Sequence, residues 1–428
     1  MKKILILVVL AILLFACSAE KEKVSSDKTQ IIFWHALGGP LGDALAELIA
    51  DFNNSHPGIH VKAIRMGRYN ALSQKLMASM QTDTRPNISQ VYESWTANFV
   101  DGDVLVSIDE MIKNDPNYGK EELNDIYQAY IKSNTIDGEM WSFPFNKSVR
   151  VLYYNKDMFF EAGLDPNKPP VTWSDFREVC KKLTKDTDGD GKIDQHGTTF
   201  SISAWQFENL LLQAGGKLMN SDYTEPLFNK KPGVVALKHL YNLLEKDDTA
   251  YLSTGYEWQN DFLAGKVAMV EGSSVSLAYM QKTGINFFMG ISAIPVYKNK
   301  KNIISGTNVA IFKSKDKEKE KAAWEFVKWF TNPAQTARWS EMTYYMPVRK
   351  SAFEEPILKE RLDRNPEIAS VYDQLKHATF EPPISEWYET RKYLQEQVIE
   401  KVFRNTLTPE EALDKAAKNL KKRLNENK

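Results

Sequence analysis

The stretch QIIFWH, residues 30–35, starts the pattern that decides the fold. It is a short, largely apolar run of the kind that forms a buried strand. Leucine and isoleucine then recur at helical spacing over 41–52, IHVKAIRM (59–66) alternates as a strand, YNALSQKLMASM (69–80) has the period of an amphipathic helix, and ISQVY (88–92) is a further strand. This alternation of strands and helices predicts an α/β fold with a parallel sheet.

Polar side chains stand where these strands end. His35 closes the first strand, Tyr69 follows the second and Glu93 follows the third. Parallel sheets bind ligands in the crevice beyond the carboxyl ends of their strands. We therefore expect a ligand site at this edge, although His35 could equally serve packing and Tyr69 could simply begin its helix.

The whole chain is too long to fold around one hydrophobic core. A chain of 428 residues predicts two domains. Aromatic strands surround Pro144, and Thr172 begins a helix with Asp175 three residues later, as in a capping box. The other expected elements are helices at 204–213, 232–246, 256–264, 316–330 and 408–424, a strand at 266–273, and a strand–turn–strand at 303–312.

The N-terminus has the features of an export signal. Two lysines precede an unbroken apolar run over 4–15, which is too short to span a bilayer. The run ends in Leu14-Phe15-Ala16-Cys17, which is similar to a bacterial lipobox. We expect 1–16 to be a signal peptide, Cys17 to be lipidated, and the polar stretch 17–29 to be a flexible tether. The alternative is an ordinary secreted protein.

Charge and cysteine content limit the function further. The net charge is −1, which argues against a nucleic-acid partner. Cys180 is the only other cysteine, so no internal disulfide is expected if Cys17 carries lipid. Common hydrolase and nucleotide-binding motifs do not occur in the sequence. A secreted glycoside hydrolase using Glu93 with Glu271, and a surface adhesin, remain as alternatives.

A series of phrases along the chain carries a family resemblance. They are FWHALGG (33–39), QVYE (90–93), PFNKSVRVLYYNKDMF (144–159), TWSDF (172–176), FLAGKVAMVEGSS (262–274), YYMPVRKSAF (344–353) and TPEEALD (408–414). In this order they resemble the family 1 solute-binding proteins of ABC importers, in particular the members that bind sn-glycerol 3-phosphate. The resemblance covers the chain from about residue 31 to its end.

The resemblance implies an architecture and a role. It implies a two-lobe periplasmic-binding-protein fold, type II-like, with hinged lobes that close on a ligand in the cleft between them. We expect lobe one at 30–142 and 303–346, and lobe two at 143–302 and 347–428. Hinges are expected near 140–144, 295–303 and 345–347. The family also implies ABC permease subunits as partners, a non-enzymatic monomer without a cofactor, and a periplasmic or cell-envelope location.

The resemblance also implies ligand-binding residues. Matching positions are Tyr69, Glu93, Ser148, Ser273, Gly306 and Tyr345. Glu93 would accept hydrogen bonds from ligand hydroxyls, the tyrosines and Ser148 would donate, and Ser273 with the Gly306 amide would hold an anion. The expected ligand is sn-glycerol 3-phosphate or a glycerophosphodiester.

Two departures from the family pattern leave a neutral oligosaccharide as an alternative ligand. Arg391 is the only candidate for the family's C-terminal arginine, and a helical pattern there could point it to solvent. Trp205 is displaced by one residue from the family's tryptophan wall. Lys147 and Arg150 could supply positive charge instead, and the side chains of Trp95 and Trp387 could stack on a sugar or pack in the core.

The loop DTDGDGKIDQHG, residues 186–197, is similar to the start of an EF-hand. Asp186, Asp188, Asp190, the Lys192 carbonyl and Asp194 stand at ligand positions, but Gly197 replaces the bidentate glutamate. HGTTF predicts a strand where the second EF-hand helix would begin. We therefore expect a single structural calcium site, or a solvated acidic turn, remote from the ligand cleft.

Overall fold

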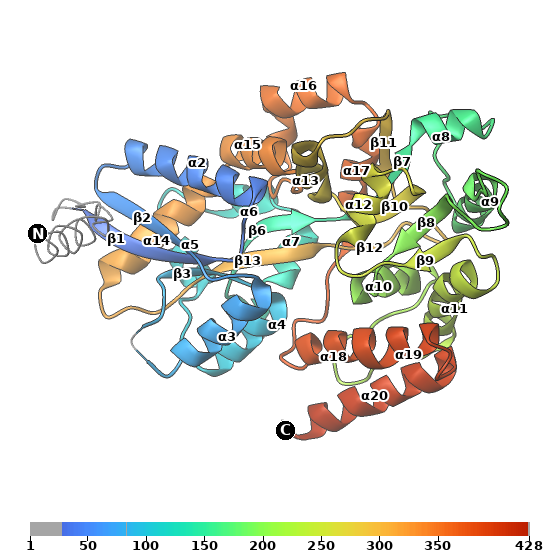
Figure 1. Cartoon of the computed structure of the whole chain (residues 1–428). Helices are drawn as coiled ribbons and strands as arrows, with labels where there is room; N and C mark the ends of the chain where they lie inside the picture. Colours follow the sequence, from blue (N-terminus) through green and yellow to red (C-terminus); the bar gives the residue numbers. More distant parts are fainter. Residues whose placement is uncertain (1–27, 83, 427–428) are drawn as a thin grey trace, which may run out of the picture.

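The computed structural model describes residues 28–82 and 84–426, which form two α/β lobes lying side by side (Figure 1). The predicted signal peptide, Cys17 and most of the tether lie outside the described residues. Within them, no helix combines the length and apolar character needed to cross a membrane.

The first lobe is built on a five-stranded sheet. β1 pairs in parallel with both β2 and β3, as the strand–helix alternation predicts, and β13 then pairs antiparallel with β3 and β6. The order across the sheet is β2 (Ile59–Arg65), β1 (Thr29–His35), β3 (Ile88–Val91), β13 (Ser305–Ile311) and β6 (Phe143–Ser148).

Helices cover both faces of this sheet (Figure 1). Phe33 of β1 is fully buried against the α2 and α14 side, whereas Val91 of β3 is buried against α3 and α4. Successive strand residues point to opposite faces, so both sides need apolar residues. The helices are α2 (Pro40–Ser55), α14 (Lys317–Phe330), α3 (Tyr69–Ser79) and α4 (Glu93–Asp101).

The second lobe holds another five-stranded sheet. β7 pairs antiparallel with its neighbours β11 and β10, and β10, β8 and β9 pair in parallel. The order is β11 (Met289–Ala293), β7 (Arg150–Asn155), β10 (Val267–Ser273), β8 (His196–Phe200) and β9 (Ala250–Leu252). Its helices are α8 (Lys156–Glu161), α9 (Trp173–Leu183), α10 (Ala204–Gln213), α11 (Lys231–Glu245), α12 (Glu257–Leu263) and α13 (Ser276–Thr283).

Several local predictions are confirmed in this lobe. Thr172 caps α9, and its hydroxyl accepts from the Asp175 amide at 3.1 Å while the Asp175 carboxylate accepts from the Thr172 amide at 3.0 Å. This reciprocal pair is the predicted capping box. HGTTF forms β8 rather than a helix, which removes the paired EF-hand.

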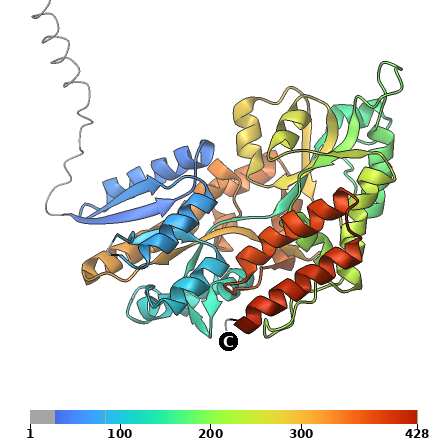
Figure 2. The same cartoon turned by 60° about the horizontal axis from the view of Figure 1, so that its bottom comes forward.

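The C-terminal segment is almost entirely helical, as predicted. It contains η1 (Ser351–Glu354), α16 (Pro356–Arg364), α17 (Ile368–Asp373), η2 (Gln374–His377), α18 (Trp387–Tyr393), η3 (Leu394–Ile399), α19 (Glu400–Phe403) and α20 (Pro409–Glu426). The last helices lie along the underside of the second lobe, which Figure 2 brings forward. α18 reaches α4 of the first lobe, where the Tyr388 ring lies 5.7 Å from the Trp95 ring.

The first crossing between the lobes lies later than predicted. β6 belongs to the first sheet, and the chain enters the second sheet only at β7, with Val149 between them. Pro144 suggested a break, but proline lacks a backbone N–H and is tolerated in an edge strand such as β6. Residues 143–148 therefore belong to lobe one rather than lobe two.

The last crossing is also later. α15 (Pro333–Thr343) is followed by α16, and Arg361 of α16 donates to the Ser340 carbonyl of α15 at 2.8 Å. α17 then packs in the second lobe, where Ser370 accepts from the Ala293 amide of β11 at 3.2 Å. The chain therefore leaves lobe one between α16 and α17, not at 345–347.

The predicted strand–turn–strand at 303–312 is corrected as well. β12 (Asn302–Ile303) pairs with β14 (Ala378–Thr379), while β13 runs unbroken from Ser305 with a register shift between Thr307 and Asn308. Gly306 suggested a turn, but it lies within β13 at φ +117°. The remaining elements are α5 (Ile108–Lys113), α6 (Lys120–Asn124), α7 (Gln128–Ser133), β4 (Thr135–Ile136) and β5 (Glu139–Met140).

Candidate functional site

A pocket of about 220 Å³ lies where the first lobe meets the C-terminal segment. It opens at the starts of α3 and α4, just beyond β2 and β3, which is the sheet edge that the sequence predicts. First-lobe residues and C-terminal residues each supply half of its lining. The lining comprises Tyr69, Asn70, Tyr92, Glu93, Ser94, Glu381, Pro382, Trp387, Tyr388 and Arg391.

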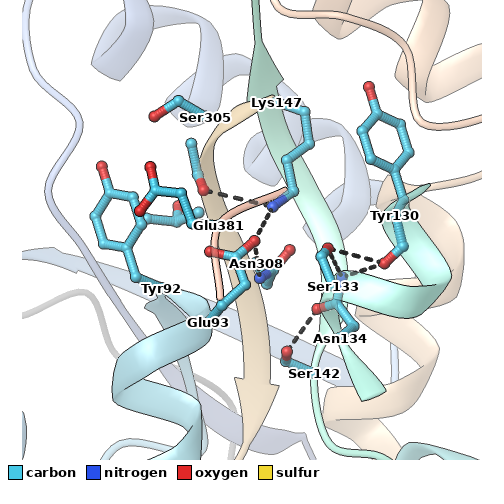
Figure 3. Close-up of polar contacts among 12 residues, drawn as sticks. Tyr92, Glu93, Tyr130, Ser133, Asn134, Ser142, Lys147, Ser305, Asn308 and Glu381 are labelled. Carbon is cyan, nitrogen blue, oxygen red and sulfur yellow. Dashed lines mark hydrogen bonds and ion pairs between the residues drawn. The ribbon is translucent and has the colours of Figure 1, made fainter. Parts of the chain in front are cut away.

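Glu93 is held by a buried lysine. Lys147 Nζ donates to Glu93 Oε1 at 2.9 Å and to the Gly306 carbonyl at 3.4 Å, and Asn308 Nδ2 donates to the same Glu93 oxygen at 3.2 Å. Only 1% of the Lys147 side chain is exposed. Figure 3 shows Tyr92 and Glu381 beside Glu93. Lys147 thus fixes Glu93 and leaves its second oxygen available to accept a hydrogen bond.

Two predicted tyrosines meet at one amide. Asn146 Nδ2 donates to the Tyr345 hydroxyl at 2.8 Å and to the Tyr69 hydroxyl at 3.3 Å. Asn146 is itself oriented by Gln90, whose Nε2 donates to Asn146 Oδ1 at 2.9 Å. Burial raises the pKa of both tyrosines, so the hydroxyls stay protonated and can donate to a ligand.

Arg391 points into the pocket and not into solvent. Its Nη1 lies 3.3 Å from Glu381, and its Nε lies 3.5 Å from Glu208, which is fully buried. Burial raises the pKa of Glu208, and it raises the pKa of Glu381 to about 8 although Arg391 opposes the shift. Arg391, the candidate for the family's C-terminal arginine, therefore lies at the pocket and is engaged by two carboxyl groups.

A second ion pair stands at the crossing between the sheets. Arg150 Nε donates to Glu271 Oε2 at 3.0 Å, and its guanidinium lies over the Trp205 ring at 5.5 Å. Trp205 Nε1 donates to the Ile303 carbonyl at 2.9 Å. Trp205 thus contacts residues at the crossing between the lobes and does not line the pocket. Glu93 and Glu271, the two carboxylates of the hydrolase alternative, are each paired with a different cation, Lys147 and Arg150.

The two predicted serines also lie at the crossing. Ser148 Oγ donates to the Ser305 carbonyl at 3.4 Å, and the Ser273 carbonyl accepts from the Tyr153 hydroxyl at 2.8 Å. Neither serine lines the pocket. The structure therefore gathers Tyr69, Glu93 and Arg391 at the pocket, with Gly306 and Tyr345 directly behind it.

Three other aromatic candidates are buried. Trp95 is 1% exposed and Trp387 is fully buried, but only Trp387 lines the pocket. His35 is buried beside Phe33, and burial lowers its pKa to about 4. These contacts favour packing for His35 and Trp95, and leave Trp387 as a wall of the pocket.

The acidic loop lies between α9 and β8, away from the pocket. The carboxylates of Asp186, Asp188 and Asp194 lie within 4.8 Å of one another and are exposed. Asp190 instead pairs with Lys192 at 3.0 Å. The loop thus brings three of the predicted calcium ligands together, and calcium at this loop stays a prediction.

The sequence pattern did not point to Tyr92 and Glu381, which line the pocket, or to Glu208, which pairs with Arg391 without lining it. Tyr92 precedes Glu93 and could have been included as its strand-end neighbour. Glu208 lies in the same helix as Trp205, but helical periodicity alone does not show that it faces Arg391. Glu381 follows no periodic pattern, since it precedes Pro382 in an irregular segment.

Comparisons with known proteins agree with this architecture. A family model described as bacterial extracellular solute-binding protein matches residues 47–369. The sn-glycerol-3-phosphate-binding periplasmic protein UgpB of Escherichia coli (strain K12) is 28% identical over 408 residues, covering 91% of each chain. UgpB of Shigella dysenteriae is 28% identical over 410 residues, again covering 91% of each.

Solved structures share the fold. UgpB from Mycobacterium tuberculosis in complex with glycerophosphocholine has a TM-score of 0.80 at 23% identity, covering 94% of this chain and 99% of the other. A substrate-binding protein from Listeria monocytogenes in complex with cycloalternan also has a TM-score of 0.80 at 23% identity, covering 93% of this chain and 100% of the other. Both neighbours show the same two-lobe fold.

Proposed function

The chain belongs to the bacterial extracellular solute-binding proteins, and from that premise we propose that it is the solute receptor of an ABC importer. The protein captures a small hydroxylated solute in the pocket and delivers it to the permease subunits. It acts by binding and lobe closure, not by catalysis. The observation that carries this proposal is the pocket itself, which is lined by the first lobe on one side and the C-terminal segment on the other.

Lobe closure is supported by contacts across the cleft. The Tyr279 hydroxyl of α13 donates to the Gly38 carbonyl at 2.9 Å, and the Tyr388 hydroxyl of α18 donates to Asn70 Oδ1 at 2.6 Å. These bonds join α13 and α18 to segments of the first lobe. A ligand that contacts both sides would favour the closed arrangement through its differential affinity.

We propose two ligand classes for the pocket. Glycerol phosphate esters, namely sn-glycerol 3-phosphate or a glycerophosphodiester, are supported by the names of the relatives and by the presence of Arg391 in the pocket. Neutral oligosaccharides are supported by the aromatic lining of Tyr69, Tyr92 and Trp387, because sugar C–H faces stack on such rings.

We also propose that the protein is anchored outside the cytoplasm. Lipidation of Cys17, after removal of 1–16, would attach the two lobes to a membrane through the tether 17–29. A monomer on such a tether can reach the permease by diffusion along the same surface. Mass spectrometry of the membrane-extracted protein tests this, and a mature chain beginning at any residue other than Cys17 would contradict it.

Tryptophan fluorescence tests the receptor role, since Trp387 lines the pocket. We expect a saturable change with a solute of one of the two classes. Arg391→Gln should weaken binding by about tenfold or more, since a charged hydrogen-bonding group is lost. Arg404→Gln is the matched control, because Arg404 pairs with Glu400 on the exposed surface. Equal binding by both variants would place the ligand elsewhere.

A further inference from the structure

A second concave surface lies beside the pocket that contains Glu93. It is a groove of about 660 Å³, and Pro382 lines both the groove and the pocket. Three segments form the groove: the end of α10 with the residues that follow it (212–223), the crossing segment 299–301, and residues 376–382 around β14. We call it the lysine groove, because its lining includes Lys217, Lys300, Lys301, Lys376 and His377.

The lining of the lysine groove contains no carboxylate among the described residues. Lys376 pairs with Asp373 at 2.7 Å, whereas Lys217, Lys300 and Lys301 have no ion pair within the described chain. The whole chain has 55 basic and 56 acidic side chains, so this local excess of positive charge does not follow from composition. A concave surface lined by one sign of charge concentrates ions of the opposite sign.

The segments that carry these lysines are fixed relative to one another. Asn299 Nδ2 donates to the Leu212 carbonyl of α10 at 3.1 Å, and Asn299 Oδ1 accepts from the Lys301 amide at 2.9 Å. β12 pairs with β14, which joins residues 302–303 to residues 378–379. The walls of the groove are therefore in place before any ligand arrives, and little backbone needs to be ordered on binding.

The loop after α10 is strained at a residue of the groove. Tyr223 lines the groove and has φ +55°, which is uncommon for a bulky side chain. Asn220 holds this loop, because its Oδ1 accepts from the amides of Thr224 at 2.8 Å and Glu225 at 2.9 Å. Strain of this kind is concentrated at ligand sites. The ring of Tyr223 belongs to an apolar part of the lining that also contains Leu212, Leu218, Met219 and Phe380.

We propose that the lysine groove binds a small organic polyanion, with two or more carboxylate or phosphate groups, at a site separate from the pocket. The lysine ammonium groups pair with the negatively charged oxygens, and the apolar part of the lining contacts the carbon body. A ligand with a single negative charge engages fewer of the cations and binds more weakly.

Isothermal titration of the purified protein with citrate and with fructose 1,6-bisphosphate, in buffer without calcium, tests the proposal. We expect saturable binding of at least one of them, at least about tenfold tighter than binding of lactate, which has one charge. The affinity should fall by about tenfold or more between about 0.05 and 0.5 M NaCl, because salt screens the exposed lysines. No saturable binding of either polyanion would overturn the proposal and leave the receptor role intact.

Variants locate the bound polyanion. Lys300→Gln combined with Lys301→Gln should weaken its binding by about tenfold or more, whereas arginine at both positions should retain it. Lys181→Gln combined with Lys182→Gln, the same change on exposed residues of α9, should have no effect. Arg391→Gln, which alters the pocket, should also have no effect. Loss of polyanion binding in Arg391→Gln but not in the Lys300 and Lys301 variant would place the polyanion in the pocket and overturn the proposal.

Anionic lipid is another source of clustered negative charge for a protein that we propose to be membrane-anchored. Sedimentation with phosphatidylglycerol vesicles compares the wild type with the double variant Lys300→Gln and Lys301→Gln. We expect equal sedimentation, because the groove is concave and a bilayer surface is flat. Loss of vesicle binding in the variant, with no binding of citrate or fructose 1,6-bisphosphate to the wild type, would assign the groove to lipid and overturn the proposal.

Discussion

At the scale of single residues, Lys147 is a buried cation with one carboxylate partner. Replacing Lys147 by Met leaves Glu93 buried, with Asn308 as the one remaining side-chain donor to it among the described residues. We expect the free energy of unfolding to fall by about 3 kcal/mol, because an uncompensated buried charge remains. The added change Glu93→Gln should restore most of the loss. Urea unfolding of both single variants and the double variant measures this.

The control for this cycle is an exposed pair. Lys376 pairs with Asp373 at 2.7 Å, and both side chains are about two-thirds exposed, at 70% and 67%. Lys376→Met should change the free energy of unfolding by less than about 0.5 kcal/mol. If Lys147→Met is equally mild, the pair with Glu93 does not stabilise the cleft.

Glu381 makes the stability of the ligand-free protein depend on pH. Its pKa rises from 4.5 to about 8, so the folded state holds a proton that the unfolded state has released between these values. The stability from this proton is full below about pH 4.5 and is lost as the pH rises to 8. Between about pH 6.5 and 8.5 we expect the wild type to lose 1–2 kcal/mol more than Glu381→Gln.

Thermal or urea unfolding at the two pH values measures this difference. The charged groups that face Glu381 are Arg391, Glu208, Glu93 and Lys147. Burial lowers the pKa of His35 and of His239 to about 4. These histidines reduce the free energy of unfolding as the pH falls toward 4, and they do so equally in the wild type and in Glu381→Gln. Parallel pH profiles for wild type and Glu381→Gln would contradict the raised pKa.

At this scale the sequence predicted part of the site. Glu93 and Tyr69 could be found because a strand pattern ends just before each of them, and parallel strands bring their carboxyl ends to one edge. Glu208 could not, because its role depends on Arg391, which is far away in the sequence. Glu381 could not either, because it lies in an irregular segment without a periodic pattern. A long-range pair of charges leaves no local pattern.

At the scale of elements, β13 depends on a glycine. Gly306 lies at φ +117°, and a Cβ there would lie 2.0 Å from the Asn146 carbonyl oxygen of β6. We expect Gly306→Ala to lower the free energy of unfolding by about 3 kcal/mol or more, and to weaken solute binding, because β6 carries Asn146 and Lys147.

Gly284→Ala is the matched control for Gly306→Ala. It has φ +103°, but a Cβ there would meet no atom within 4 Å in the described part of the chain. Gly284→Ala should cost only about 1 kcal/mol, from backbone strain alone. Equal losses in urea unfolding would show that the close approach of β13 to β6 is not what requires glycine.

The boundaries of elements were predictable mainly where local chemistry sets them. Thr172 and Asp175 start α9 through their own hydrogen bonds, so the sequence alone places this end. Pro144 and Gly306 were interpreted as breaks, yet both lie in strands. Pro144 lies in the edge strand β6, and Gly306 lies in β13 at a positive φ. Strand pairing across the sheet determines the structure at these two positions, and local residue propensities do not reflect it.

The acidic loop after α9 carries the calcium prediction. Asp186, Asp188 and Asp194 bring their carboxylates within 4.8 Å, and hard cations prefer such oxygen ligands. We expect excess calcium to raise the melting temperature by a few degrees, and Asp188→Asn to remove this rise.

Asp190→Asn distinguishes a calcium site made by Asp186, Asp188 and Asp194 from the larger predicted set that also contains Asp190. Asp190 pairs with Lys192, so this variant should keep most of the calcium effect. If it abolishes the effect, the larger set predicted from the EF-hand similarity binds the ion. A wild type whose melting temperature is the same in calcium and in chelator would contradict the site.

At the scale of the whole molecule, the proposed lobe closure involves contacts between the lobes that lie outside the pocket. The bond from the Tyr279 hydroxyl to the Gly38 carbonyl joins α13 of the second lobe to the loop before α2. Close by, Lys282 pairs with Asp43 at 3.2 Å. Neither pair lines the pocket, so both can stabilise the closed arrangement without contacting the ligand.

We therefore expect Tyr279→Phe to weaken solute binding by about fivefold, because one hydrogen bond contributes about 1 kcal/mol and is made only when the lobes meet. The free energy of unfolding should change little, since each lobe keeps its own core. Tyr241→Phe removes a comparable 2.7 Å bond to Asn405 within the second lobe and should leave affinity unchanged. Titration of both variants, with small-angle scattering before and after ligand, measures closure directly. Equal affinity for Tyr279→Phe and Tyr241→Phe would mean that the ligand, and not the Tyr279 contact outside the pocket, holds the lobes together.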